Sequence, residues 1–269
     1  MNILYCGDSN IKKGIELSVK SVIKYNKNPV NIFIVTANIN FDGKSYKSID
    51  ENFAEKLRKT AKSTNEDSDV YLIDISEKFS SALPVANMDT RFTPLCMLRL
   101  FADEIEIIPD KILYLDADVL CLKTIDELYN QPIADFDLAG VLDRYGSWLF
   151  RKHIFHRDYL NSGVLLLNMD KIRSDGLFKR CREVCISKKM FMPDQSAINK
   201  LAVKKILPRK FNEQGKIKSE TVFKHFATFF RFFPYFKAIT VKPWEVEKVH
   251  KVLKLYCFDD IILEGDNNE

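Results

Sequence analysis

The stretch Lys111-Ile-Leu-Tyr-Leu-Asp-Ala-Asp-Val119 decides the fold, because it is an apolar strand that ends in two carboxylates. Residues 112–115 are apolar, follow a Pro-Asp turn and predict a short buried strand. Alternate residues of an extended chain point to the same side, so Asp116 and Asp118 can face one point beyond the strand end. Two carboxylates with room for water suit Mg²⁺ or Mn²⁺ held jointly with a diphosphate. The simpler alternative is a loop whose aspartates cap a neighbouring helix.

Strands and helices alternate along the rest of the chain. Apolar runs predict strands over residues 2–5, 30–36, 70–75, 137–142 and 160–168, the last interrupted by Ser162-Gly163. Apolar residues at helical spacing predict helices over 15–23, 49–61, 171–188 and 194–201, and Thr93-Pro94 begins another. Residues 48–51 have the form of a capping box, and the weak alternation of residues 70–75 indicates burial on both faces. This order predicts an α/β fold with a Rossmann-like, mostly parallel sheet and a site at the carboxyl ends of its strands.

Length and composition fit one soluble domain. The 269 residues, 46% of them hydrophobic and 29% charged, are enough for a sizeable core. We expect this domain to span residues 1–256 and residues 257–269 to be an acidic tail that is frayed from residue 259 onward. The first residues lack a basic segment followed by an apolar run, and no stretch is apolar for long enough to span a membrane. We therefore expect neither a signal peptide nor a transmembrane segment.

The six cysteines are scattered and contain no Cys-x-x-Cys pair. Cys181 and Cys185 lie one helical turn apart, which indicates a buried helix face more than a metal site. We interpret all six as reduced thiols of a cytosolic protein.

Polar residues gather at the predicted strand ends and at the start of one helix: Asp8, Asn10, Asp116, Asp118, Asp143, Asn161, Asp194 and Gln195. Each alone is weak evidence, because turns favour Asp and Asn for local reasons. Their shared position beside apolar strands is what indicates a site.

With these residues the chain resembles the family 8 glycosyltransferases, retaining enzymes of GT-A fold that include bacterial galactosyl- and glucosyltransferases and glycogenin. The resemblance runs from Asn2 to about Trp244. The matching segments, in the order of the family, are residues 3–10, 111–119, 159–168, 193–199, 225–226 and 242–244. It implies a single domain of GT-A type.

The resemblance also implies a role for each matching residue. The metal ligands would be Asp116, Asp118 and His225, holding Mn²⁺ or Mg²⁺ between the phosphates of UDP-glucose or UDP-galactose. The donor-binding residues would be Cys6, Asp8 and Asn10 at the uracil, Arg99 and Ala117 near the sugar and phosphates, Asp143, Asn161, Ser162 and Gly163 around the sugar, and Lys242 at the β-phosphate. The catalytic residues would be Gln195, beside the anomeric carbon, and Asp194, which would also read sugar hydroxyls.

The physical chemistry of the transfer is consistent with these roles. A leaving diphosphate gains charge as the glycosidic bond breaks, so a divalent cation and a lysine stabilise the transition state more than the ground state. Because the amide of Gln195 is a poor nucleophile, we favour front-face substitution, in which the leaving phosphate accepts the proton of the acceptor. Double displacement through Asp194 is the alternative.

The segment between His225 and Lys242 departs from the family pattern. Members commonly continue the histidine as His-(Tyr/Phe)-x-Gly and reach Lys-Pro-Trp soon afterwards, whereas here the glycine is absent and residues 226–241 form a longer, aromatic insertion. It lies in a basic region, since residues 200–256 contain fourteen Lys and Arg against four Asp and Glu. The insertion is either a small hydrophobic subdomain packed under the metal loop or a platform for an acceptor at a membrane surface.

The sequence therefore predicts a metal-dependent retaining hexosyltransferase that uses a UDP-sugar and a glycan or lipid-linked acceptor. We expect a cytoplasmic enzyme, in peripheral contact with the inner face of a bacterial membrane where surface polysaccharide is made. The alternative is a non-catalytic nucleotide-sugar-binding protein of the same fold. A nucleotidyltransferase is less favoured because a Gly-rich phosphate loop is absent, and nucleic-acid binding because no recognised module accompanies the aromatics.

Overall fold

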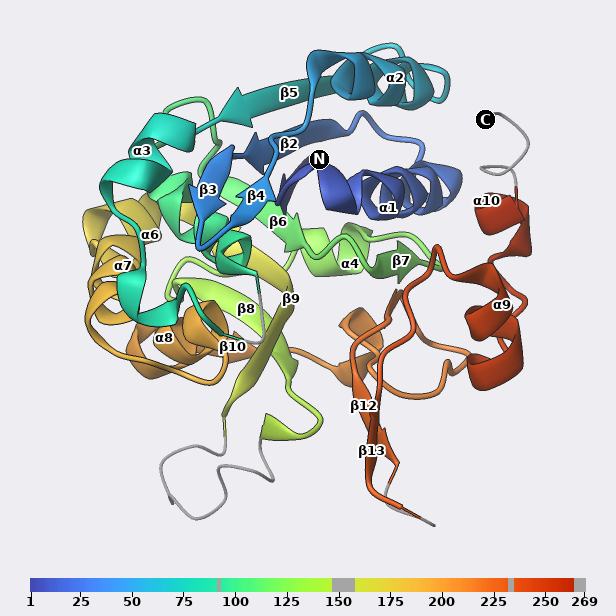
Figure 1. Cartoon of the computed structure of the whole chain (residues 1–269). Coiled ribbons are helices and arrows are strands. Elements are labelled where there is room, and N and C mark those ends of the chain that lie inside the picture. Colours follow the sequence, from blue (N-terminus) through green and yellow to red (C-terminus); the bar gives the residue numbers. More distant parts are fainter. Residues whose placement is uncertain (91–92, 147–157, 232–234, 264–269) are drawn as a thin grey trace.

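The strand predicted at residues 112–115 lies at the middle of a seven-stranded sheet (Figure 1). The computed structural model of the chain describes residues 1–90, 93–146, 158–231 and 235–263. In spatial order the strands are β10 (Lys204–Ile206), β8 (Leu138–Leu142), β9 (Leu160–Asn168), β6 (Lys111–Leu115), β1 (Asn2–Cys6), β2 (Asn31–Thr36) and β5 (Asp69–Asp74). All neighbours run parallel except β9, which is antiparallel to both β6 and β8. The prediction of a mostly parallel α/β sheet is confirmed.

Alternation along β1 shows how the sheet separates two cores. Ile3 and Tyr5 point into one apolar cluster, whereas Leu4 between them points into the other. The first cluster is covered by α1 (Lys12–Tyr25), α2 (Glu51–Lys62) and α4 (Asp126–Tyr129). The second is covered by α3 (Ser76–Ser81), the 3₁₀ helix η3 (Pro94–Glu104), α6 (Met169–Ser174), α7 (Leu177–Ser187) and α8 (Pro193–Leu201). The sheet is thus a rigid central layer with its strand ends at the rim.

Short elements connect this frame. They are the 3₁₀ turns η1 (Ser9–Ile11), η2 (Val85–Asn87) and η4 (Arg209–Phe211), and the hairpin of β3 (Ile39–Phe41) and β4 (Lys44–Tyr46). In the described part of the chain, every helix is too short or too polar to cross a membrane. The six cysteines are free, and Cys181 and Cys185 are buried on α7 as expected.

The C-terminal part attaches beside the sheet. β7 (Val119–Cys121), directly after Asp118, pairs antiparallel with β11 (Phe223–His225), so His225 lies opposite Val119. A hairpin of β12 (Phe229–Arg231) and β13 (Lys237–Ile239) follows and projects from the body (Figure 1). The chain then forms α9 (Val246–Lys248), the π-helical turn η5 (Val249–Leu253) and α10 (Asp259–Ile262), which enclose a third apolar cluster with α1 and β7.

Several local predictions are wrong. Ser48 does not cap α2; instead the Asp50 carboxylate accepts the Phe53 amide at 3.0 Å, so the helix begins at Glu51. β5, the edge strand of the sheet, is not buried on both faces, because Val70 is its only buried residue and Tyr71 is exposed. The helix expected over 171–188 is two helices, divided at Gly176, whose φ of 62° ends the first and begins the second.

Two further differences concern the site and the tail. β9 runs through Ser162 and Gly163 as one strand, but its register with β8 shifts there, because Gly140 pairs with Leu165 and Leu142 with Leu160. The predicted fraying does not hold for residues 259–262, because they form α10 and bury Ile261 and Ile262 against the third cluster. Residues 264–269 lie outside the described part.

Candidate active site

Strand direction brings the candidate residues to one rim of the sheet. Asp8, Asp116 and Asp143 follow the carboxyl ends of the parallel strands β1, β6 and β8. Asn161, Ser162 and Gly163 open β9, and because β9 is antiparallel to its neighbours its beginning lies at the same rim. A cleft of about 540 Å³ lies there, and every predicted site residue except Gly163 lines it.

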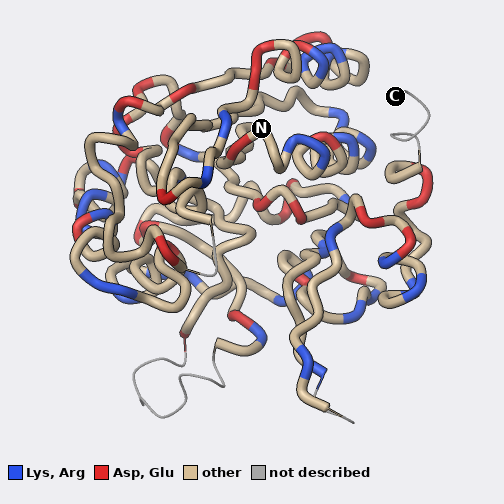
Figure 2. The backbone as a smooth tube through the Cα atoms, in the orientation of Figure 1, with Lys and Arg blue, Asp and Glu red and all other residues tan. Residues whose placement is uncertain are grey.

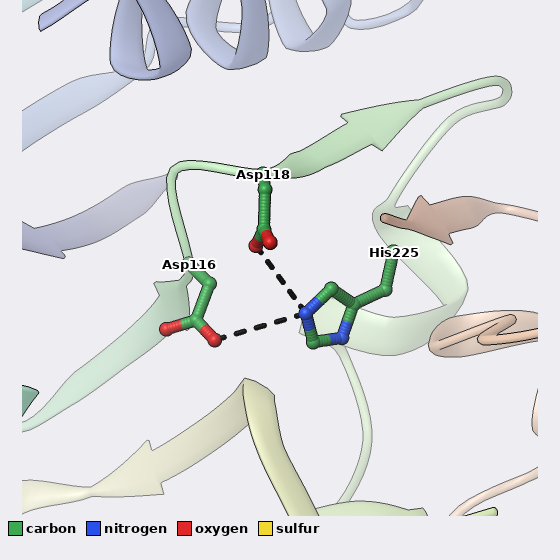
Figure 3. Close-up of side chains that lie close together, drawn as sticks. All are labelled: Asp116, Asp118 and His225. Atoms are coloured by element: carbon green, nitrogen blue, oxygen red, sulfur yellow. Dashed lines mark ion pairs between the residues drawn. The ribbon is translucent and has the colours of Figure 1, made fainter. Parts of the chain in front are cut away.

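The three predicted metal ligands converge in this cleft (Figure 3). The Nε2 atom of His225 is 3.3 Å from Asp118 Oδ1 and 3.8 Å from Asp116 Oδ2. One ligand atom from each residue can be chosen so that all lie within 4.8 Å of one another. The turn after β6 supplies the two carboxylates, and the pairing of β11 with β7 supplies the imidazole.

The second oxygen of each carboxylate is held by a cation outside the cluster. Asp116 Oδ1 accepts hydrogen bonds from Arg99 Nη2 at 3.0 Å and from the hydroxyl of Tyr114 at 2.7 Å. Asp118 Oδ2 accepts from the ammonium group of Lys242 at 2.5 Å. Burial alone would raise the pKa of Asp118, but Lys242 and His225 outweigh it and hold that pKa well below its usual range. Asp118 is therefore ionised, as a carboxylate must be to ligate a metal.

The imidazole of His225 is oriented from behind by Asn212. The Nδ1 atom of His225 lies 3.1 Å from Oδ1 of Asn212, a fully buried side chain. The amide nitrogen of Asn212 donates to Asn161 Oδ1 at 2.9 Å, which fixes Asn212 with its oxygen toward the histidine. Asn212 Oδ1 is therefore placed to accept the Nδ1 proton, and Nε2 is the ring atom that faces the two carboxylates.

Gly163 lies directly beneath the cluster. A Cβ atom at this position would be 2.3 Å from Cε1 of His225 and 2.9 Å from Oδ2 of Asp116. The Gly163 carbonyl also accepts the backbone amide of Asp116 at 2.9 Å. The position therefore needs a glycine because the His225 ring and the Asp116 carboxylate pack against its backbone.

Gln195 and Asp194 occupy the first turn of α8 and are both buried. The side-chain oxygen of Gln195 accepts from the backbone amide of Ser162 at 3.0 Å and from its hydroxyl at 3.2 Å. The Asp194 carboxylate forms an ion pair with Arg99 Nε at 3.2 Å. Burial raises the pKa of Asp194 even though the guanidinium opposes the rise.

The remaining candidates are fixed by hydrogen bonds to their neighbours. Asp143 accepts the backbone amides of Tyr145 and Gly146 at 2.9 and 2.6 Å, and its other oxygen accepts from Asn161 at 3.0 Å. Asp8 caps η1 through the amide of Asn10 and also accepts from the Asn10 side chain at 2.8 Å. The carboxylates of Asp8 and Asp143 therefore stabilise the local backbone as well as lining the cleft.

Sequence reasoning missed two residues that set the geometry. Tyr114 lies in the apolar run that predicts the strand, and that pattern gives no role to its hydroxyl. Burial raises the pKa of Tyr114 well above the usual value, so the hydroxyl stays protonated and donates to Asp116. Asn212 follows η4 in an irregular segment, and no pattern in the sequence connects it to His225. The cleft also contains aromatic side chains: Tyr145 and Phe191, which were not predicted, Phe230 of the insertion, and Trp244 of the last matching segment.

The donor set fits a divalent cation. One oxygen of each aspartate and one imidazole nitrogen face a common point, while Arg99, Lys242 and Asn212 hold the opposite atom of each ligand. Mixed carboxylate and imidazole ligation with open positions suits Mn²⁺, and with water also Mg²⁺.

Comparison of the sequence with known families finds one match over most of the chain. The profile described as glycosyl transferase family 8 matches residues 2–248. A lipopolysaccharide 1,2-glucosyltransferase of Escherichia coli is 29% identical over 262 residues, covering 90% of this chain and 73% of that protein. A lipopolysaccharide 1,3-galactosyltransferase of Salmonella typhimurium is 26% identical over 252 residues, covering 84% and 70%.

Solved structures share the fold at lower identity. The galactosyltransferase LgtC, in a complex with donor and acceptor sugar analogues, superposes with a TM-score of 0.71 at 18% identity and covers 99% of this chain and 96% of its own. The glycosyltransferase GlyE of Streptococcus pneumoniae superposes with a TM-score of 0.67 at 16% identity, covering 99% and 64%. This chain and both solved structures therefore share the GT-A architecture.

Proposed function

This chain belongs to glycosyl transferase family 8, and from that premise we propose that it transfers a hexose from UDP-glucose or UDP-galactose to a glycan with retention of configuration. The observation that carries the proposal is the cluster of Asp116, Asp118 and His225, with Lys242 at its edge and the buried Gln195 in the same cleft. The acceptor we propose is a sugar of a lipid-linked surface glycan at the cytoplasmic face of a membrane. The names of the lipopolysaccharide-modifying relatives support this acceptor class.

The charges of the cleft are placed for the departure of a diphosphate. Mn²⁺ or Mg²⁺ held by Asp116, Asp118 and His225 would act as a Lewis acid toward the phosphate oxygens. The ammonium of Lys242, now on Asp118, is within reach of the same point and would stabilise the charge that develops on the leaving group. Asp8 and Asn10, at the end of β1, are the residues that we propose for the uracil.

The bonds of Asp194 and Gln195 favour front-face substitution. A nucleophilic carboxylate needs a free lone pair at the anomeric carbon, but Asp194 is buried and paired with Arg99. The oxygen of Gln195 is turned toward Ser162, and its amide nitrogen lies 3.4 Å from Asp143 Oδ2. We therefore propose that the leaving phosphate takes the acceptor proton and that Gln195 positions the donor sugar.

The acceptor side of the cleft is proposed to be the inner face of the β12–β13 hairpin. Phe230 lines the cleft and packs edge-on against Tyr145, with ring centroids 4.8 Å apart. The hydroxyl of Tyr145 accepts the Phe230 amide at 3.2 Å, which ties the hairpin to the loop after β8. Aromatic faces beside a sugar site suit the apolar side of a second sugar ring.

Hydrolysis of the donor tests this function without knowledge of the acceptor. The purified protein is incubated with UDP-glucose, UDP-galactose, GDP-mannose and ADP-glucose, each with Mn²⁺, with Mg²⁺ or with EDTA, and free nucleoside diphosphate is measured. We expect slow release of UDP from a UDP-hexose that stops in EDTA and in Asp118→Ala. Tight binding of UDP-hexose with no release would indicate the non-catalytic binding protein, and equal use of GDP- or ADP-sugars would contradict the uracil site.

A further inference from the structure

The two faces of the β12–β13 hairpin carry different chemistry. Residues directly opposite each other share a face, and Phe230 pairs with Ala238 whereas Arg231 pairs with Lys237. The Phe230 face is turned to the cleft, and Phe236 stacks on Phe230 with centroids 5.5 Å apart. The Arg231 and Lys237 side chains therefore belong to the opposite face.

That opposite face places two cations side by side without an acidic partner. Arg231 and Lys237 are both exposed, and like charges directly across a strand pair repel. Residues 226–244 contain no Asp or Glu, and neither cation forms an ion pair with a residue in the described part of the chain. Figure 2 shows these basic positions on the projecting hairpin. An arrangement that costs free energy in the isolated protein is favourable beside an anionic surface.

Aromatic side chains are exposed next to these cations. Tyr235 is 82% exposed and Phe236 is 67% exposed, the highest values among the large hydrophobic residues that are described. Both directly precede β13, in a hairpin that extends beyond the body of the molecule (Figure 1). Aromatic rings with adjacent Lys and Arg are typical of the zone between lipid headgroups and acyl chains, where the ring is half buried and the cation meets phosphate.

We propose that this hairpin docks the protein on an anionic lipid bilayer through Arg231, Lys237 and Tyr235. The proposal rests on the proposed function in one respect: docking on the bilayer would give the proposed lipid-linked acceptor its route to the cleft. The same hairpin that contacts the bilayer with one face lines the cleft with the other, so docking brings the bilayer beside the acceptor side. The surface recognised is a two-dimensional array of phosphates, which matches two adjacent cations better than a single bound anion does.

Vesicle binding tests the docking surface. Sedimentation is measured with vesicles of phosphatidylcholine alone and with phosphatidylcholine containing phosphatidylglycerol, for wild type and for Arg231→Gln/Lys237→Gln. The matched control is Lys59→Gln/Lys62→Gln, which removes two exposed lysines from α2 on the far side of the molecule (Figure 1). We expect about a thirtyfold loss of affinity for the anionic vesicles in the hairpin variant and little loss in the control, because each cation near such a surface strengthens binding about fivefold.

A second variant separates the aromatic contribution from the charge. Tyr235→Ser should weaken binding to anionic vesicles at high salt as well as at low salt, whereas the loss caused by the charge variant should shrink as salt rises. Tyr256→Ser, another exposed tyrosine (61%), should leave vesicle binding unchanged. Equal losses in hairpin and control variants, equal binding to neutral vesicles, or hairpin-dependent binding to single-stranded RNA in place of vesicles would each overturn the proposal.

Donor hydrolysis measured on the same samples keeps the two proposals apart. The hairpin variants should hydrolyse UDP-hexose at the wild-type rate in solution and keep the wild-type melting temperature. A protein that docks on vesicles through the hairpin but releases no UDP would refute the proposed function alone. A protein that releases UDP but binds anionic vesicles equally well without the two cations would refute the docking surface alone.

Discussion

Replacing Gly163 by alanine should disable metal binding more than it disables folding. The added Cβ would be 2.3 Å from Cε1 of His225, against about 3.5 Å for two carbon atoms in normal contact, so ring and strand must separate by about 1.2 Å. Metal–ligand distances tolerate only about 0.2 Å of error. We therefore expect Gly163→Ala to lose the imidazole as a ligand, with about a hundredfold fall in Mn²⁺-dependent UDP affinity and in donor hydrolysis.

The chain offers a matched control for this experiment. Gly140 is also a strand glycine, and a Cβ there would meet Cδ2 of Leu165 at 2.8 Å, away from the metal cluster. Gly140→Ala and Gly163→Ala should each cost about 1–3 kcal/mol of unfolding free energy through overpacking. Calorimetric titration of UDP with and without Mn²⁺, together with denaturant unfolding, distinguishes the two effects. Wild-type Mn²⁺ dependence in Gly163→Ala would refute the placement of His225 as a ligand.

Three further outcomes follow from the same site. Asp118→Ala and Asp116→Ala should each abolish turnover and Mn²⁺-dependent UDP binding. Each should also lose about 1–3 kcal/mol of stability while remaining folded, because each takes a carboxylate from a cation, Lys242 or Arg99. Undiminished Mn²⁺-dependent UDP affinity in either would show that the pair is structural. Lys242→Met should weaken UDP binding about tenfold yet strengthen Mn²⁺ binding in the absence of nucleotide, because Asp118 Oδ2 loses its ammonium partner. Electron paramagnetic resonance measures Mn²⁺ binding directly, and weaker Mn²⁺ binding in this variant would contradict the expectation. An α-linked UDP-hexose should give an α-linked product, and an NMR coupling constant typical of a β-linkage would exclude retention.

The sequence predicted those parts of the fold that depend on local periodicity. The apolar run before Asp116 gave β6, and the four-residue spacing of Phe53, Leu57 and Ala61 gave the buried face of α2. The direction of β9 could not be predicted from the sequence, because a fully buried strand is apolar on both faces whichever way it runs. That direction matters, since it places Asn161 and Gly163 at the rim with the two aspartates.

The candidate site was predictable as a set of residues but not as a network of contacts. The resemblance to the family supplied His225 and Lys242, and the structure places both against Asp118. The support behind the ligands escaped prediction: Asn212 reaches His225 only through tertiary packing. The insertion divides between its two interpretations: Phe226 and Val241 are buried in the third cluster, as packing under the metal loop requires, whereas Tyr235 and Phe236 are exposed, as a platform requires.

The most direct test of the central claim is a crystal structure of the protein with Mn²⁺ and UDP, with diffraction data collected at the manganese absorption edge. We expect a single anomalous peak about 2.1 Å from Asp116, Asp118 and His225 Nε2, with both phosphates of UDP in its remaining positions and the ammonium of Lys242 moved from Asp118 to the β-phosphate. An anomalous peak away from these three side chains, or UDP bound in the cleft without one, would contradict a metal-dependent transferase site built on this cluster.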